Sequence, residues 1–415
     1  MKRREFMLAA TLSPFVPLRA IAAEREVKPD LVGTPFLQRW PDGPYARNIW
    51  AMQVFGGRLF LGAGNSSNFG PSSNAGPVPI LSYDGRKFTE EYTVNDEQVA
   101  RFYQAGDVLY VPGHDPRDDW SYGNLYRLAG GAWTKLRNIP RGIHVYDIRH
   151  HAGRLVAVGG AYGQPLSAWI SEDEATSWQP AALIPNPALA QSLVPLGRAT
   201  KVLGQDTQVV GRFWTLFEIG DSLYASTSAP LGSVQGDPHP RMATLFRFDP
   251  AQNGFQPLAL GHSSALFPDT PATGAQVGLV ERWARLGKET AYIGGWQHND
   301  HQWLPIGLYA ASSADNARRL QLPASEQPRD LLVEKGRLYC LSSRAEGPDR
   351  YRVSVTRFGR DLKAGTVVLS FPAPTFARSF ALFQGRFYFG LGTETGTGTA
   401  LSDAAGTILS TPFVP

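Results

Sequence analysis

The sequence is poor in several features that define other classes of protein. Only one of its 415 residues is cysteine, so no internal disulfide can form, and Cys340 lies in a strand-like run typical of a small buried residue. Charged residues make up only 18% of the chain, and no apolar run reaches the roughly 20 residues that a membrane-spanning helix needs. The 43 glycines and 32 prolines exclude a helical bundle, and the 11% of aromatic residues exclude a disordered chain. What remains is a large globular protein of many short strands and tight turns.

A net positive charge is also almost absent outside the N-terminus, because basic and acidic residues nearly balance there. Residues 1–23 contain four basic side chains and one acidic side chain, which leaves a net charge of +1 for the rest of the chain. A nearly neutral surface gives little support to nucleic-acid binding or to attraction by an anionic membrane. We therefore expect neither partner.

The 23 N-terminal residues have the layout of an export leader. A basic start at Lys2-Arg3-Arg4 precedes an apolar stretch from Phe6 to Leu18, and the small residues at 20–23 suit cleavage. The run Arg3-Arg4-Glu5-Phe6-Met7 resembles the twin-arginine signal of bacterial proteins that are exported already folded. This resemblance implies a periplasmic or secreted protein that is not inserted in a membrane after the leader is removed, with a single mature domain over 24–415.

A short motif recurs seven times along the chain: glycine or a polar residue, then a charged residue, then an apolar strand. The charged residues of the seven copies are Arg58, Asp107, Arg154, Asp221, Glu289, Arg337 and Arg386. Their spacings are 49, 47, 67, 68, 48 and 49 residues, so we expect insertions in the two long steps, near 179–210 and near 229–241 or 261–278. An internal period of this length indicates a repeat architecture.

Further strand-like runs flank each copy, with turns on Gly, Asp or Asn between them. Ile49–Val54 precedes the first copy, Ile80–Gly85 follows it, and a fourth run follows the next turn, as in Trp133–Leu136. Four antiparallel strands repeated seven times predict an all-β, seven-bladed β-propeller, in which neighbouring blades bury each other's faces. Two sandwich domains are the alternative, but they do not explain the regular step. The segment around Pro35-Phe36-Leu37 is a candidate for the outer strand of the last blade.

One segment of the third repeat resembles a known structural motif. Residues 171–178, Ser-Glu-Asp-Glu-Ala-Thr-Ser-Trp, are similar to the Asp-box (Ser-x-Asp-x-Gly-x-Thr-Trp) of the sialidase-like propellers. The resemblance implies a turn in which Asp173 caps backbone N–H groups and Trp178 packs between strands. Ala175 and Ser177 depart from the glycine and the threonine of the motif. Because the Phe-Arg-Ile-Pro segment of sialidases is absent, sialic acid hydrolysis is not expected.

Cationic side chains gather near the starts of the innermost strands, which a propeller places on one face. The arginines at these positions are Arg101, Arg212, Arg282, Arg329 and Arg378. One interpretation is a ring of ion pairs around a wet channel, with Asp147, Glu281 and Asp330 as partners. The other is a pocket in which the arginines bind an anionic ligand, because a guanidinium matches a carboxylate, sulfate or phosphate.

Loops between the second and third strands return to the same face, where function often gathers. His114 lies in such a loop of the second repeat, and the fifth repeat has Trp296, His298, His301 and Trp303 within eight residues. Tryptophans that stack on sugars and histidines that bond hydroxyls predict a wall for a glycan, and an ordinary polar loop is the alternative. The His298-x-x-His301 spacing occurs in zinc sites, but no second pair accompanies it. No metal or other cofactor is therefore predicted, and a divalent cation stays open.

This combination of residue types predicts an exported glycan-directed protein, in particular a lyase acting on uronate-containing glycans. His144 and Tyr146, two apart on one innermost strand, are the expected groups for removing the proton beside the uronate carboxylate, which the arginines would clamp. His298 or His301 would assist the leaving oxygen. A non-catalytic propeller that binds a glycan or a protein is the alternative, and a glycoside hydrolase using two channel carboxylates is a third. The expected partner is an anionic glycan or a small anionic ligand, bound by a monomer.

Overall fold

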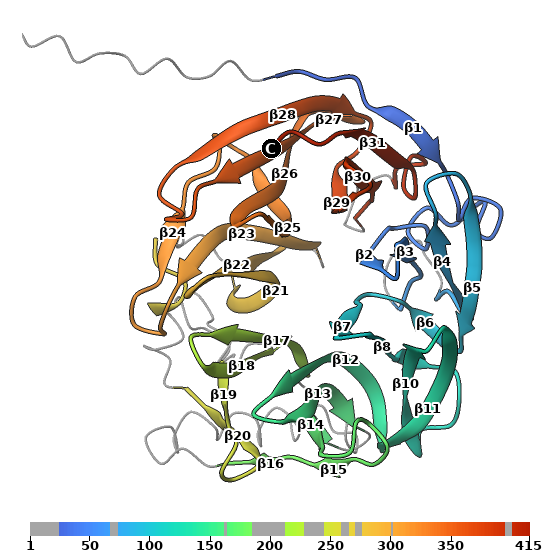
Figure 1. The fold of residues 1–415 in the computed structure, drawn as a ribbon, viewed down its shortest axis with the longest axis vertical. Helices are drawn as coiled ribbons and strands as arrows, with labels where there is room; N and C mark the ends of the chain where they lie inside the picture. Colours follow the sequence, from blue (N-terminus) through green and yellow to red (C-terminus); the bar gives the residue numbers. More distant parts are fainter. Residues whose placement is uncertain are drawn as a thin grey trace, which may run out of the picture.

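The computed structural model describes residues 25–66, 74–161, 164–184, 212–227, 245–258, 265–269, 276–299, 302–394 and 401–415. Its elements are all β-strands, and they form seven small sheets arranged in a ring (Figure 1). The predicted seven-bladed β-propeller is therefore confirmed. The predicted export leader lies outside the described residues, and within those residues no helix is long and apolar enough to cross a membrane.

Each blade runs from an innermost strand beside the central axis to an outermost strand at the rim. Blade one contains β2 (Ala51–Phe55), β3 (Arg58–Gly62), β4 (Val78–Tyr83) and β5 (Phe88–Val94). Blade two contains β7 (Tyr103–Ala105), β8 (Val108–Pro112), β10 (Tyr122–Ala129) and β11 (Ala132–Pro140). Blade three contains β12 (Gly142–His151), β13 (Arg154–Ala161), β14 (Gln164–Ser171) and β15 (Gln179–Pro180). Blade four contains β17 (Phe213–Ile219), β18 (Ser222–Thr227), β19 (Phe246–Asp249) and β20 (Gly254–Pro257).

The remaining blades follow the same order. Blade five contains β21 (Gln276–Leu286), β22 (Glu289–Asn299), β23 (Gln302–Ala311) and β24 (Arg318–Leu320). Blade six contains β25 (Gln327–Glu334), β26 (Arg337–Gly347), β27 (Arg350–Phe358) and β28 (Gly365–Ala373). Blade seven contains β29 (Ala377–Phe383), β30 (Arg386–Leu391), β31 (Ile408–Pro412) and, from the other end of the chain, β1 (Asp30–Gly33). Three short strands extend this scheme: β6 (Asp96–Gln98), β9 (His114–Pro116) and β16 (Ala182–Leu183).

The ring is closed by the N-terminal segment, as expected, but not by the residues that the sequence suggested. β1 pairs antiparallel with β31, with Asp30 opposite Ser410. The segment around Phe36 instead forms a turn, because the Phe36 ring is buried in the core between blades seven and one. Closure therefore joins the two ends of the described chain within one blade.

The recurring motif is the hairpin between the first and second strands of each blade. In blades one, three, six and seven both residues of this turn have positive φ, as in Gly56 (54°) and Gly57 (73°). In blades two, four and five the first residue, a glycine, has positive φ, as in Gly106 (58°). Such turns match the right-handed twist of the paired strands, and glycine adopts them without strain. The repeated glycine is thus a requirement of the turn.

The core is divided among the interfaces between blades. Seven clusters of buried side chains lie in the described part of the chain, and each draws residues from two neighbouring blades. Cys340 belongs to one of them, between blades five and six, where burial raises the pKa of its thiol. The expectation of a buried, non-nucleophilic cysteine is confirmed. Because the blades share their cores, they are expected to unfold together.

The segment that resembles an Asp-box forms a capped turn. Asp173 Oδ1 accepts hydrogen bonds from the Ser177 backbone N–H (2.8 Å) and from the Ser171 hydroxyl (2.8 Å). Trp178 is buried in the core between blades two and three. Ala175 has φ of +69°, a conformation that favours the glycine of the motif. The local geometry agrees with the resemblance, whereas membership of the sialidase-like superfamily stays a prediction.

Candidate functional site

The site begins where blades two and three are joined by an extra ladder. β9 lies in the connection between β8 and β10, and it pairs antiparallel with both β6 and β12. His114 on β9 therefore stands opposite Gln98 on one side and His144 on the other. Antiparallel pairing brings the two histidines together, although they belong to different repeats. The loop expected on the face of the innermost strands does lie there.

An aromatic cluster surrounds these histidines. The Tyr146 ring lies 4.4 Å from the His114 ring, 5.5 Å from the His144 ring and 4.6 Å from the Trp214 ring, measured between centroids. Arg212, which precedes β17 of blade four, donates a hydrogen bond from Nη1 to the Tyr146 hydroxyl (2.5 Å). Four of the residues singled out from the sequence, His114, His144, Tyr146 and Arg212, thus form one cluster. With Asp115 and Trp214 they make up what we call the histidine cluster.

Burial keeps both imidazoles of the cluster neutral. Burial, reinforced by the positive charges of Arg212 and Arg101, lowers the pKa of His114 to about 3. Burial and the Arg212 charge also lower the pKa of His144. Asp115 contacts His144 Nδ1. At neutral pH the His144 ring is therefore an uncharged base whose Nδ1–H is directed at a carboxylate.

The tyrosine at the centre of the cluster is protonated at neutral pH. Burial raises the pKa of Tyr146, and the Arg212 charge offsets this only in part. Because the hydroxyl oxygen accepts a hydrogen bond from Arg212, its own proton is free to be donated elsewhere. His144, with 12% of its side chain exposed, opens the cluster to solvent. The cluster thus contains a neutral base, a protonated acid and a cation.

Two of the five channel arginines are used in bonds between blades. Arg101 donates to Thr215 Oγ1 (2.7 Å) and to the Glu281 carbonyl (3.2 Å). Arg282 donates to the carbonyl of Trp50 in the loop before β2 (2.6 Å). These contacts join blades on different sides of the axis, as in the ion-pair interpretation of the sequence. The substrate-binding role of Arg101 and Arg282 stays a prediction that this geometry does not support.

Two carboxylates, the buried Asp147 and the half-buried Asp330, link consecutive blades. Asp147 accepts hydrogen bonds from the backbone N–H groups of Ile148 (2.9 Å) and Leu216 (2.9 Å), the second of which lies on blade four. Asp330 likewise accepts from Leu331 (2.9 Å) and from Phe380 (3.0 Å) on blade seven. Each carboxylate also lies near an arginine, Asp147 at 3.9 Å from Arg101 and Asp330 at 3.6 Å from Arg282. Carboxylates bound in this way are poorly placed to serve a glycoside hydrolase.

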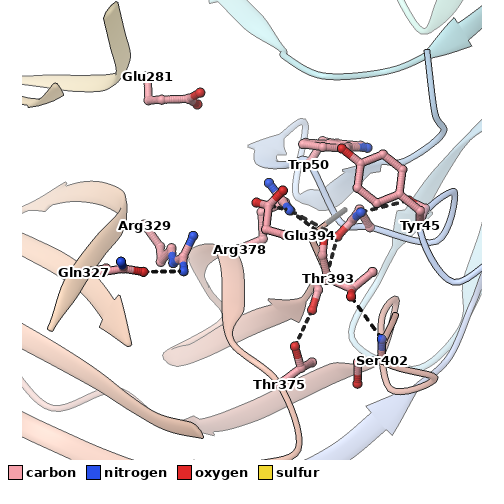
Figure 2. Close-up of polar contacts among 12 residues, drawn as sticks. Tyr45, Trp50, Glu281, Gln327, Arg329, Thr375, Arg378, Thr393, Glu394 and Ser402 are labelled. Atoms are coloured by element: carbon pink, nitrogen blue, oxygen red, sulfur yellow. Dashed lines mark hydrogen bonds and ion pairs between the residues drawn. The ribbon is translucent and has the colours of Figure 1, made fainter. Parts of the chain in front are cut away.

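The remaining two arginines lie on the opposite side of the central opening, on β25 and β29 (Figures 1 and 2). The Arg378 guanidinium lies 4.1 Å from the Trp50 ring and 5.2 Å from the Phe376 ring, and it pairs with Glu394 (2.6 Å). The Arg329 guanidinium lies 4.0 Å from the Phe376 ring and donates to Gln327 Oε1 (2.9 Å). Arg329, Arg378, Trp50, Phe376 and Glu394 make up what we call the arginine cluster.

The predicted sugar-binding wall forms a long hairpin rather than an irregular loop. β22 and β23 of blade five continue through it, with Gln276 of β21 opposite Trp296, and His298 opposite Trp303. The side chains of Trp296, His298 and Trp303, and all of His301, lie outside the described residues. Their predicted roles stay predictions. Among the residues that are described, no group of three His, Cys, Asp or Glu side chains is placed to hold a metal ion.

Comparison with known proteins adds little to this geometry. No protein-family model and no curated protein matches the chain. Among solved structures, it is similar to the WD40 repeats of RRP9 (10% identity, 88% of this chain and 94% of that chain, TM-score 0.49). It is also similar to a putative 6-phosphogluconolactonase from Bacteroides fragilis (11% identity, 82% and 89%, TM-score 0.42). These likenesses are too distant to indicate an activity, and the class of the protein, a seven-bladed β-propeller, rests on its own sheets.

Sequence reasoning missed the supporting members of both clusters. Asp115 and Trp214 are not among the predicted site residues, yet Asp115 contacts His144 and Trp214 packs on the Tyr146 ring. The spacing of Trp214, two residues after Arg212, places both at the start of one innermost strand, and this was the available signal. No comparable pattern in the sequence predicts the contacts of Phe376 with Arg329 and Arg378.

Proposed function

We propose that the protein is an exported lyase that cleaves uronate-containing glycans by β-elimination at the histidine cluster. The observation that carries the proposal is the meeting of two neutral imidazoles, a protonated tyrosine and a guanidinium within one set of ring contacts. This is the set of groups that a β-elimination needs: a base, an acid and a cation for the uronate carboxylate. An anionic glycan is accordingly the proposed partner, and the periplasm or the cell exterior the proposed location.

The reaction needs no external reactant. A base removes the proton on C5 of the uronate ring, the electrons of that C–H bond form a C4–C5 double bond, and the C4–O bond breaks. The leaving oxygen then takes up a proton from an acid. A cation beside the uronate carboxylate stabilises the negative charge that develops during proton removal. Atoms and electrons balance within the substrate and the two protein groups.

His144 is the proposed base. Its Nδ1 is held by Asp115, so the lone pair of Nε2 is the one that can accept a proton. The neutral form of the ring predominates because burial and Arg212 lower its pKa. Of the cluster's two histidines it is also the one with greater access to solvent, since His114 is buried.

Tyr146 is the proposed acid, and Arg212 the proposed carboxylate-binding cation. The Tyr146 hydroxyl accepts its hydrogen bond from Arg212, which leaves the O–H free to protonate the leaving oxygen. The pKa of Tyr146 is raised by burial, so the group is protonated in the resting protein. His298 and His301, the earlier candidates for this role, have no described side-chain geometry.

The test is a panel of uronate polymers incubated with the mature protein and its variants. The ultraviolet absorbance of the new C4–C5 double bond reports elimination. We expect His144→Ala and Tyr146→Phe to reduce kcat by about 10²–10⁴-fold, the usual contribution of a general acid or base. His150→Ala is the matched control, because His150 lies at the other end of the same strand, beside Glu174. Wild-type rates in both site variants would contradict the proposal.

A non-catalytic glycan-binding propeller is the second candidate. It is favoured by the near-complete burial of Tyr146, because a side chain that is only 3% exposed has little access to a glycan. A binding protein needs no proton transfer, so its His144→Ala variant would bind glycans as before. Glycan binding without any unsaturated product, across the whole panel, would select this candidate over the lyase.

A further inference from the structure

The arginine cluster holds more positive charge than its own carboxylate neutralises. Arg378 pairs with Glu394 at 2.6 Å, and this is the carboxylate of the cluster. Arg329 donates instead to two neutral oxygens, Gln327 Oε1 (2.9 Å) and Ser343 Oγ (3.2 Å). Within the described part of the chain, no carboxylate lies within 4.0 Å of Arg329. Two guanidinium groups therefore share one close counter-charge.

The fixed position of Arg329 leaves one of its nitrogens unused. One face of the guanidinium lies 4.0 Å from the Phe376 ring, and the two hydrogen bonds hold Nε and Nη2. Nη1 makes no hydrogen bond to any described residue, and it is not one of the fully buried unpaired atoms. The group is thus oriented by its neighbours and still able to bind a ligand.

The surroundings disfavour an uncompensated charge at this position. Burial lowers the pKa of Arg329 to about 10; the negative charge of Glu394 opposes this shift, and the positive charge of Arg378 adds to it. At neutral pH the guanidinium remains charged despite this cost. A monovalent anion at Nη1 would offset the repulsion from Arg378 and add a hydrogen bond in which both partners are charged.

We propose that Arg329 forms a second anion subsite, which takes the carboxylate or sulfate of a sugar residue other than the one at which cleavage occurs. This inference rests on the proposed function for the identity of the ligand as a glycan. β25, which carries Arg329, lies across the central opening from β12, which carries His144 (Figure 1). A ligand that occupies both places must therefore be an oligosaccharide with at least two anionic groups. Glu281, which Figure 2 shows on the same side as Arg329, attracts the Arg329 charge more weakly than Glu394 does.

The subsite is tested in a protein that lacks the other anion-binding arginine. In the Arg212→Gln background, binding of sodium glucuronate and of sodium sulfate is measured separately by calorimetry at constant ionic strength. Adding Arg329→Gln should weaken the binding of at least one of the two anions about tenfold, the effect of losing roughly 1.4 kcal/mol of charged hydrogen bonding. Adding Arg337→Gln, at an exposed arginine that begins β26 of the same blade, should change binding less than twofold. The anion that binds more tightly identifies the substituent as a carboxylate or a sulfate.

The outcomes separate this inference from the lyase proposal. If uronate polymers are not cleaved but Arg329→Gln still weakens anion binding about tenfold, the lyase proposal fails and the subsite stands. If polymers are cleaved and Arg329→Gln binds both anions as its parent does, the subsite fails alone. Arg329→Lys, which keeps the charge, guards against misfolding: it should retain more binding than Arg329→Gln at an equal melting temperature. Equal loss in both variants without loss of fold would also overturn the proposal.

Discussion

Two regions on opposite sides of the central opening combine the same elements and differ in chemistry. In the histidine cluster, Arg212 lies 5.9 Å from the Tyr146 ring and bonds its hydroxyl; in the arginine cluster, Arg378 lies 4.1 Å from the Trp50 ring. Both regions hold a guanidinium over an aromatic side chain. Of the two, the first adds a neutral imidazole and a protonated tyrosine, His144 and Tyr146, whereas Glu394 of the second is paired with Arg378. A guanidinium over an aromatic ring is therefore sufficient for binding, whereas catalysis also needs neighbouring groups that transfer a proton.

The same substitution in the two regions should have different kinetic consequences. Arg212→Gln removes the cation beside the reacting carboxylate, so we expect kcat to fall by about 10²–10³-fold, as when an oxyanion donor is lost. Arg329→Gln removes only binding, so KM for long oligosaccharides should rise about tenfold while kcat stays within about twofold. Steady-state kinetics on oligouronates of defined length measures both. Equal losses of kcat in the two variants would erase the distinction between the regions.

The link between blades six and seven, which carry Arg329 and Arg378, can be broken by removing the Asp330 carboxylate. Asp330→Ala leaves the backbone N–H groups of Leu331 and Phe380 without their acceptor and leaves Arg282 without its carboxylate at 3.6 Å. We expect a loss of about 2–4 kcal/mol in the free energy of unfolding, because buried partners are left unpaired. Urea denaturation measures the loss. Asp221→Ala, at an exposed turn, is the control and should stay within about 0.5 kcal/mol of wild type.

Asp115 is a positioning residue of the histidine cluster, and its substitution tests how His144 is held. Asp115→Asn keeps the size of the side chain but removes the charge that holds His144 Nδ1–H. We expect kcat/KM to fall about 10–100-fold, a typical cost of losing an orienting partner. A merely structural residue would not move the pH profile, whereas here the acid limb of kcat/KM should shift to lower pH. An unchanged profile would remove Asp115 from the mechanism.

The pH dependence of the wild-type reaction tests the state of the imidazoles. Burial lowers the pKa of His114 to about 3 and also lowers that of His144. A lowered pKa means that the ring stays an uncharged base as the pH falls through the ordinary histidine range near 6.5. The acid limb of kcat/KM should therefore have an apparent pKa below about 6.5. A midpoint above that value would contradict a lowered pKa of the base.

A smaller effect is expected from a carboxyl that neither region uses. Asp96 is fully buried, and burial raises its pKa to about 6. The folded protein then holds a proton that the unfolded chain, with an ordinary pKa near 3.9, has lost, so stability falls as the pH rises from about 4 to 6. Asp96→Asn should be more stable than wild type by about 1–2 kcal/mol above pH 6. Thermal melts at several pH values test this, and a deficit at every pH would contradict it.

The fold could be derived from the sequence because each blade repeats one turn requirement. The glycines before Arg58, Asp107 and Arg154 are needed because these turn positions have positive φ. The repeat of the blades could therefore be recognised from the recurrence of these glycines in the sequence. The closing strand was misplaced by a few residues because β1 and the turn around Phe36 are both short and apolar. The local sequence pattern does not show whether a buried aromatic residue such as Phe36 belongs to a strand or to a turn.

The candidate site was harder to derive, because its contacts join residues far apart in the chain. Propeller topology places the starts of the innermost strands and the loops between the second and third strands on one face. This alone was enough to predict that His144, Tyr146 and His114 lie together. The hydrogen-bond partners of the channel arginines could not be predicted in this way. Arg101 bonds Thr215, and Arg282 bonds the carbonyl of Trp50, through side-chain conformations that the sequence repeat does not encode.

The most direct test of the central claim is a mass balance on a defined oligouronate treated with the wild-type protein. Elimination at the histidine cluster predicts fragments whose masses add up to that of the substrate, with one fragment unsaturated, and no such fragments with His144→Ala. Fragments that together contain one additional water molecule would show hydrolysis. That result, or unsaturated products formed equally well without His144, would contradict the account.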